Sequence, residues 1–184
     1  MGEALLVFVP VLGSPLLHAG VLRYDLLRRL KRPLDGGARF RGHRVLGDNK
    51  TWRGALIMFT GVVLFTLVLS TWPAYWDALP DELRDAGPLP VGALIGAAVV
   101  LGELPNSFLK RQLGVAPGAR RRSALGAVLT IYDQADFVPA IVLFLAPIWL
   151  MPLEAVLAGF AIVVVVHLVI NVVGYAIGAR TEPI

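Results

Sequence analysis

The chain has 184 residues, of which 57% are hydrophobic and 16% are charged. A soluble domain carries roughly 25% charged residues, so this chain has too few charges to cover a surface that faces water. It contains no cysteine, which excludes disulfides, thiolate metal sites and a cysteine nucleophile. The net charge of +4 indicates basic loops beside anionic lipid headgroups, and we expect no nucleic-acid partner.

Five apolar segments are long enough for transmembrane helices, because a span needs roughly 17–25 mostly apolar residues. The sequence therefore predicts an all-α, polytopic protein of the cell membrane, built as a single domain over residues 1–184. The first segment follows Glu3 instead of a basic region and has no cleavage motif, so we expect it to remain as a span. The five segments are Ala4–Leu22, Gly54–Trp76, Ala86–Leu109, Phe137–Leu153 and Ala155–Ala179.

The basic residues are distributed unevenly among the connecting loops. Loops at about residues 23–53 and 110–134 are basic, whereas the loop around Asp77–Asp85 is acidic. Ten of the 17 lysines and arginines lie in the first basic loop, five lie in the second, and one follows the last segment. Under the positive-inside rule, the amino terminus is outside and the carboxyl terminus is cytoplasmic, which an odd number of spans satisfies.

Ser123–Tyr132 is apolar but only ten residues long, which is too short for a span. Two interpretations stay open. The segment is either a re-entrant or interfacial piece, or a cytoplasmic extension of the fourth helix.

Three acidic residues occupy positions where a carboxylate is costly. Glu103 lies within the third apolar segment, and Asp133 and Asp136 stand three residues apart before the fourth, so a helix places both on one face. A carboxylate at membrane depth is a candidate functional group, and clustered oxygen ligands near cations suit Mg²⁺. The alternative is structural: Glu103 pairs with Lys110 or Arg111, and the two aspartates cap a helix.

The loop that precedes the second apolar segment carries hydrogen-bond donors beside glycines. Such an arrangement can hold phosphate through backbone N–H groups, the helix N-terminus and cations. It is not a Walker A loop, because Asn49 and Arg44 stand where that pattern needs glycine. The donors are Asn49, Lys50, Thr51 and Arg53.

Four stretches, in this order, resemble motifs of the CDP-archaeol synthases, which are relatives of the bacterial CDP-diacylglycerol synthases (phosphatidate cytidylyltransferases). Phe40–Gly54 is similar to FRG-x-R-hydrophobic-x-GDGKTWRG, and Gly102–Arg111 is similar to GD-x-x-x-S-x-x-KR. Asp133–Phe137 is similar to DQ-x-DF, and His167–Tyr175 is similar to H-x-x-x-N-x-x-GY. The resemblance covers nearly the whole chain, which is identified as a member of this family.

The resemblance implies a CTP-dependent cytidylyltransferase that converts a lipid phosphate to a CDP-activated lipid and pyrophosphate, for phospholipid biosynthesis. The acceptor would be an isoprenoid ether-linked or phosphatidic acid-like phosphate, Mg²⁺ would be the cofactor, and the site would face the cytoplasm. A homodimer is compatible with the sequence. The resemblance assigns metal ligation to Glu103, Asp133 and Asp136, catalysis to Lys110, Arg111 and Asp136, and substrate binding to Asp48, Asn49, Lys50, Thr51, Arg53 and Ser107.

The chain departs from the family pattern at two positions, with Glu103 where aspartate is usual and Asn49 where the loop has glycine. These departures motivate an alternative, a catalytically degenerate member that binds lipid or partners. A second alternative is a small ion-coupled transporter with Glu103 on the ion path.

Overall fold

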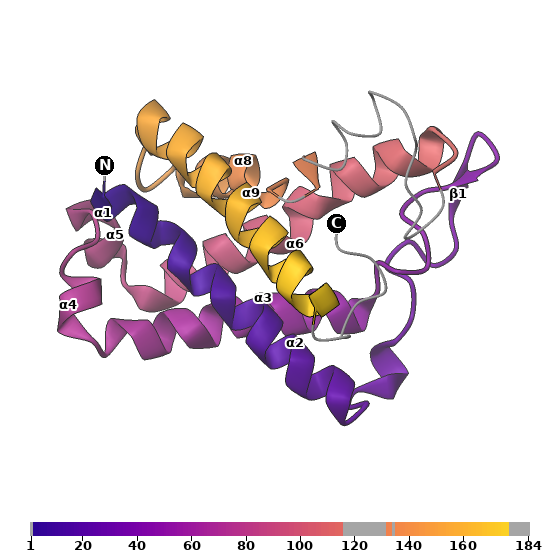
Figure 1. The fold of residues 1–184 in the computed structure, drawn as a ribbon, viewed down its shortest axis with the longest axis horizontal. Coiled ribbons are helices and arrows are strands. Elements are labelled where there is room, and N and C mark those ends of the chain that lie inside the picture. Colours follow the sequence, from indigo (N-terminus) through magenta and orange to yellow (C-terminus); the bar gives the residue numbers. More distant parts are fainter. Residues whose placement is uncertain (1, 116–131, 134, 177–184) are drawn as a thin grey trace.

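The computed structural model describes residues 2–115, 132, 133 and 135–176, and Figure 1 shows their arrangement. The chain is mostly helical, as the sequence predicts, with one addition. A small antiparallel hairpin, β1 (Arg39–Phe40) and β2 (His43–Arg44), lies in the first basic loop, with Phe40 opposite His43. Most of the short apolar stretch 123–132 lies outside the described residues.

The first apolar segment is helical throughout but changes its geometry along its length. It consists of α1 (Gly2–Leu5), a 3₁₀ helix η1 (Leu6–Leu12) and α2 (Gly13–Arg23). Pro10 lies inside η1, and a proline has no N–H to donate within a helix. A 3₁₀ run of seven residues is unusually long, because such helices seldom exceed three or four residues. A second short 3₁₀ turn, η2 (Arg28–Leu30), follows α2.

The second apolar segment forms α3 (Trp52–Ser70), which ends earlier than the predicted boundary at Trp76. Pro73 explains the early end, because the residue before a proline is disfavoured in the helical region, and Trp72 is extended. Two short helices follow, α4 (Pro73–Trp76) and α5 (Asp81–Ala86). The longest helix, α6, then runs from Pro88 to Gln112.

The last two predicted spans differ from each other in length. Helix α8 (Phe137–Leu145) has nine residues and ends before Pro147, whereas the prediction extends to Leu153. Helix α9 (Leu153–Ala176) has 24 residues. Among the described residues, three helical segments are long and apolar enough to cross a membrane, namely Gly2–Arg23, Trp52–Ser70 and Pro88–Gln112.

Helix α6 packs against α3 and α8, and α3 also packs against α2. Buried aliphatic side chains, among them Val62 of α3, Ile95 of α6 and Ile141 of α8, fill the spaces between these helices. Glycines permit the closest approach of α2 and α3. A Cβ atom at Gly13 would lie 2.3 Å from the backbone oxygen of Gly61.

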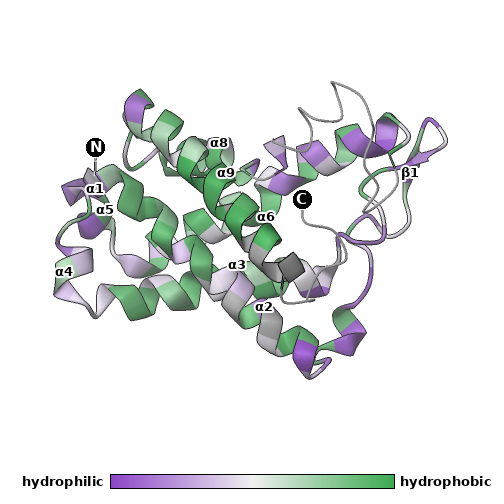
Figure 2. Ribbon diagram, in the orientation of Figure 1, coloured by the Kyte–Doolittle hydropathy of each residue, from purple (hydrophilic) through white to green (hydrophobic). Residues whose placement is uncertain are grey.

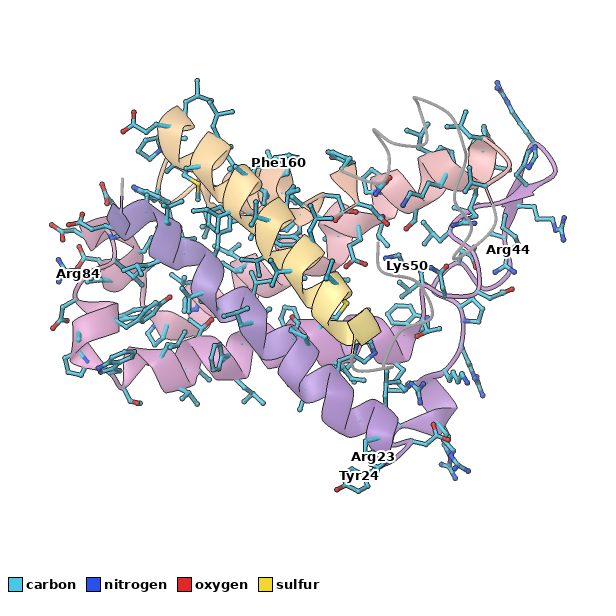
Figure 3. The ribbon with its side chains drawn as sticks, viewed as in Figure 1. Arg23, Tyr24, Arg44, Lys50, Arg84 and Phe160 are labelled. Carbon is cyan, nitrogen blue, oxygen red and sulfur yellow. The ribbon has the colours of Figure 1, made fainter. Side chains whose placement is uncertain are left out.

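The hydrophilic residues gather at the ends of the helices, and the middle of the molecule is apolar (Figure 2). Arg84, in α5, lies at one end, whereas Arg44 and Lys50 lie at the other (Figure 3). This second end carries the hairpin and the C-terminal turns of α6. The candidate site is built there.

Candidate active site

The core of the site is a polar cluster between α6 and the turn before α8. The Asn106 Nδ2 amide donates to Asp133 Oδ1 at 2.9 Å and to Asp136 Oδ2 at 3.0 Å. The Lys110 ammonium group, one turn further along α6, pairs with Asp133. Asn106 and Asp136 are buried, at 2% and 5% exposed. We call Asn106, Lys110, Asp133 and Asp136 the acid cluster.

Gly102 allows α6 to approach α8 closely enough to form this cluster. A Cβ atom at position 102 would lie 2.8 Å from Ala140 Cβ, 2.9 Å from Phe137 Cα and 3.2 Å from the backbone oxygen of Asp136. Contacts below 3.0 Å to backbone atoms cannot be relieved by rotating a side chain. The glycine therefore sets the distance between the helix that carries Asn106 and the turn that carries Asp136.

Glu103 pairs with a residue that neither interpretation from the sequence names. Its carboxylate accepts from the ammonium group of Lys50, and both side chains are 22% exposed. Lys50 lies 53 positions earlier, in the loop before α3. The structural alternative, in which Glu103 pairs with Lys110 or Arg111, does not match the contacts of the described residues, because Lys110 pairs with Asp133.

The loop of residues 33–50, which we call the basic-end loop, brings Lys50 to this place. Its two ends run side by side: Leu34 N donates to Lys50 O at 2.8 Å, and Trp52 N donates to Arg32 O at 3.0 Å. Thr51 closes the loop as the N-cap of α3, where its Oγ1 accepts from Gly54 N at 3.1 Å. A threonine at this position satisfies one of the free N–H groups of the helix.

Asp48 and Asn49 lie on the exposed side of the loop. The side chain of Asp48 is 75% exposed and accepts from Arg44 Nη1 at 2.6 Å. Asn49 is also exposed, and its Oδ1 lies next to Gly47. Both residues are therefore open to a ligand from solution.

Arg53 is oriented toward the end of α2. It is 7% exposed, and its Nη1 donates to Asp25 Oδ1 at 2.8 Å and to Leu26 O at 3.4 Å. The hydrogen bond from Arg53, opposed by partial burial and assisted by Arg28, holds the pKa of the Asp25 carboxyl below its ordinary value. The structure thus brings Arg53 to Asp25 and does not bring it into contact with the acid cluster.

Ser107 and Arg111 are both buried near the C-terminal end of α6, at 7% exposed. The Nη1 of Arg111 donates to Val115 O, and its Cδ and Nε pack against Gly47 of the basic-end loop. Within the described part of the chain, the Nε of Arg111 is buried without a hydrogen-bond partner. A buried N–H left unpaired is costly, and this one is enclosed by protein atoms.

A metal ion would have to compete with the lysines that already pair with Glu103 and with Asp133. In the ranges that the structure describes, no group of three or more histidine or acidic residues is arranged to hold a metal, and Glu103 is engaged by Lys50. Asp133 and Asp136 converge on Asn106, whose Oδ1 is buried and unpartnered among the described residues. Two neighbouring carboxylates suit Mg²⁺, which completes its shell with water and substrate phosphates. The Asn106 amide turns its nitrogen, and not its oxygen, toward both of them.

Two residues of the site lack a role in the interpretation from sequence. Asn106 stands three residues after Glu103, and this helical spacing could have placed it beside the acids. Asp35 begins an Asp-Gly-Gly turn, and its side chain is 2% exposed. The turn was recognisable, but no sequence pattern indicates that its carboxylate is buried.

A family model described as CarS-like CDP-archaeol synthase matches residues 28–183. The CDP-archaeol synthase of Halobacterium salinarum is 36% identical over 159 residues, and that of Halorubrum lacusprofundi is 37% identical over 162, each covering 83% of both chains. The CDP-archaeol synthase of Methanosarcina mazei is 31% identical over 170 residues, covering 83% of this chain and 90% of its own.

The fold also has a solved counterpart. That structure is described as an intramembrane enzyme for archaeal membrane lipids biosynthesis. It superimposes with a TM-score of 0.67 at 22% identity and covers 92% of each chain. At this identity the likeness concerns the fold, which is that of a membrane-embedded helical protein.

Proposed function

Because this chain belongs to the CDP-archaeol synthase family, we propose that it is a CTP-dependent cytidylyltransferase that makes a CDP-activated lipid for membrane lipid biosynthesis. The names of its relatives indicate an isoprenoid ether-linked lipid phosphate as the acceptor. The observation that carries the proposal is the convergence of the acid cluster, Lys50 and Glu103 at one end of the helices.

The reaction is a phosphoryl-group substitution. An oxygen of the lipid phosphate attacks the α-phosphorus of CTP, the bond to the β-phosphate breaks, and pyrophosphate leaves. Negative charge builds on the leaving group, so positioning and electrostatic stabilisation supply most of the catalysis. No covalent intermediate with a side chain is needed.

The residues divide this work between them. Asp136, and Asp133 once Lys110 has moved to a phosphate oxygen, would hold Mg²⁺, which neutralises and orients phosphate oxygens when it is bound. Lys110 and Lys50 pair with carboxylates in the structure. When nucleotide enters, both ammonium groups would leave these carboxylates and pair with phosphate oxygens. Arg111 would contribute the positive charge of its guanidinium, which packs against Gly47. The exposed Asp48 and Asn49 would contact CTP from the basic-end loop.

We also propose the membrane arrangement expected from the sequence, with the segment Phe137–Leu153, which begins with α8, and α9 completing five spans, the amino terminus outside and the site facing the cytoplasm. The support is that the basic loop 23–53 lies at the Lys50 end, whereas acidic residues lie in and beside α5, namely Asp77, Asp81, Glu82 and Asp85. The chain has no cysteine, so single cysteines at exposed Arg39 and Glu82 report the two sides. An impermeant thiol reagent should label Glu82→Cys, and not Arg39→Cys, from outside intact cells.

The function is tested by mixing purified protein with Mg²⁺ and CTP labelled at the α-phosphate. We expect label in the lipid with an ether-linked isoprenoid phosphate, and less label with phosphatidic acid or a polyprenyl phosphate. CTP labelled at the γ-phosphate is the matched control, because its label must leave with pyrophosphate. Absence of transfer to every acceptor would overturn the proposal.

A further inference from the structure

Asp35 is the most enclosed carboxylate of the basic-end loop and receives four hydrogen bonds. Its Oδ1 accepts from Arg44 Nη2 at 2.8 Å and from Gly37 N at 3.0 Å. Its Oδ2 accepts from Leu46 N at 2.9 Å and from Gly47 N at 3.2 Å. Every donor lies within the loop, so this one carboxylate holds the loop closed from inside.

These bonds reach the exposed part of the loop by two routes, each through one intermediate residue. The guanidinium of Arg44 donates to Asp35 with Nη2 and to Asp48 Oδ1 with Nη1. Gly47, the next anchored residue, accepts from Lys50 N at its own backbone oxygen, at 3.3 Å. The positions of Asp48 and Lys50 therefore both depend on groups that Asp35 holds.

The anchored segment also rests on α6. Gln112 Nε2 donates to the backbone oxygen of Arg44 at 3.2 Å. Gly47 has a φ of 91°, a conformation that favours glycine, and packs against the Arg111 side chain. The loop is thus fixed at the C-terminal end of α6, next to Arg111 and Gln112.

We propose that Asp35 is a positioning residue for nucleotide: it touches neither substrate, and it orders residues 44–50 so that Asp48, Asn49 and Lys50 meet CTP together. The inference rests on the proposed function, since it takes CTP as the ligand of the loop. It assigns a role to a residue outside the four family-like motifs, in the turn that precedes them.

The charge of the carboxylate is part of this role. Burial opposes ionisation of Asp35, but the hydrogen bonds from Arg44, Leu46, Gly37 and Gly47 outweigh it and hold the pKa well below the ordinary value. An asparagine has the same shape, but its NH₂ group would face either two backbone N–H groups or the Arg44 guanidinium. Asp35→Asn therefore removes the negative charge and one of the two acceptor oxygens with little change in volume.

The test compares the kinetics of Asp35→Asn with those of the wild type. We expect the KM for CTP to rise ~10-fold, a difference of about 1.4 kcal/mol, while the KM for the lipid phosphate stays within twofold. Glu82→Gln is the matched control, since it removes one carboxylate from exposed α5 at the opposite end and should leave both constants unchanged. An unchanged KM for CTP in Asp35→Asn would overturn the proposal.

Hydrogen exchange separates a local effect from general misfolding. Asp35→Asn should speed exchange at the Leu46 and Gly47 amides and leave the peptides of α3 and α6 protected. Loss of protection in α3 and α6 would contradict the proposal, because Asp35 would then support the whole fold. If the wild type does not bind CTP but Asp35→Asn still loosens residues 44–47, the proposed function fails and the structural part of the inference stands.

Discussion

Asp136 owes its position to the packing of two helices, whereas Asp48 and Lys50 owe theirs to hydrogen bonds inside a loop. In the acid cluster, Gly102 lets α6 and α8 approach until Asn106 reaches Asp136. In the basic-end loop, by contrast, the buried carboxylate of Asp35 gathers backbone amides and a guanidinium. The first arrangement is sensitive to added volume, and the second is sensitive to the loss of one acceptor.

The largest effect should come from removing the buried carboxylate of Asp136 in the acid cluster. We expect Asp136→Asn to reduce transfer of CMP to lipid by at least about 10²-fold, the scale on which preorganised charge contributes to catalysis. Asparagine keeps the shape, so the helices should remain folded. The measurement is incorporation of α-labelled CTP, with circular dichroism as the check on folding. Full activity in this variant would remove Asp136 from the site.

The second largest effect on stability and activity should come from adding volume at Gly102. Gly102→Ala places a methyl group against the backbone of Phe137, and overpacking of this kind costs about 1–3 kcal/mol. We expect a lower unfolding temperature in detergent and reduced activity, because Asn106 moves away from Asp136. Gly20→Ala is the control, since a Cβ there meets nothing within 4 Å. Equal behaviour of the two variants would show that the approach of α6 to α8 is not tight.

A smaller effect should distinguish two roles for Arg53. The sequence predicts that it binds substrate, and the structure pairs it with Asp25. If the pair joins α2 to α3, Arg53→Gln and Asp25→Asn should lower the unfolding temperature by similar amounts, and neither should change the KM for CTP. We expect this result from the burial of Arg53. A raised KM in Arg53→Gln alone would favour nucleotide binding.

The smallest expected effect is that of pH on the order of the basic-end loop. Folding lowers the pKa of Asp35, so its contribution to loop order is fully present above the unfolded value of about 3.9 and is lost as pH falls toward the folded value. Protection of the Leu46 and Gly47 amides, corrected for intrinsic exchange, should therefore stay constant from pH 8 to pH 5. A decrease between pH 7 and pH 5 would mean that another group orders the loop.

The helical segments were largely predictable, and their boundaries failed where proline intervenes. Hydropathy placed the first segment (α1, η1 and α2 together), the start of α3, α6 and the start of α9 close to their observed positions, because apolar length is a local property. It placed the end of the second segment at Trp76, yet Pro73 ends α3 earlier. The same error extended the fourth segment beyond α8, past Pro147.

The composition of the candidate site was predictable in part. The motifs name Lys110, Asp133 and Asp136, and the structure brings these three together around Asn106. Their roles in metal and phosphate binding stay predictions. The contacts between site residues were harder to predict than the identity of those residues. Glu103 has two cations nearby on its own helix but pairs instead with Lys50 from a distant loop.

The sequence by itself determined that this is a helical membrane protein of the CDP-archaeol synthase family with its basic side chains at one end, because hydropathy, charge and motif order can be read residue by residue. Only the tertiary structure decided which groups meet. The pairing of Lys50 with Glu103, the enclosure of Asp35 and the approach of Asn106 to Asp136 each depend on how separate segments pack, and packing distances are not encoded in any local pattern.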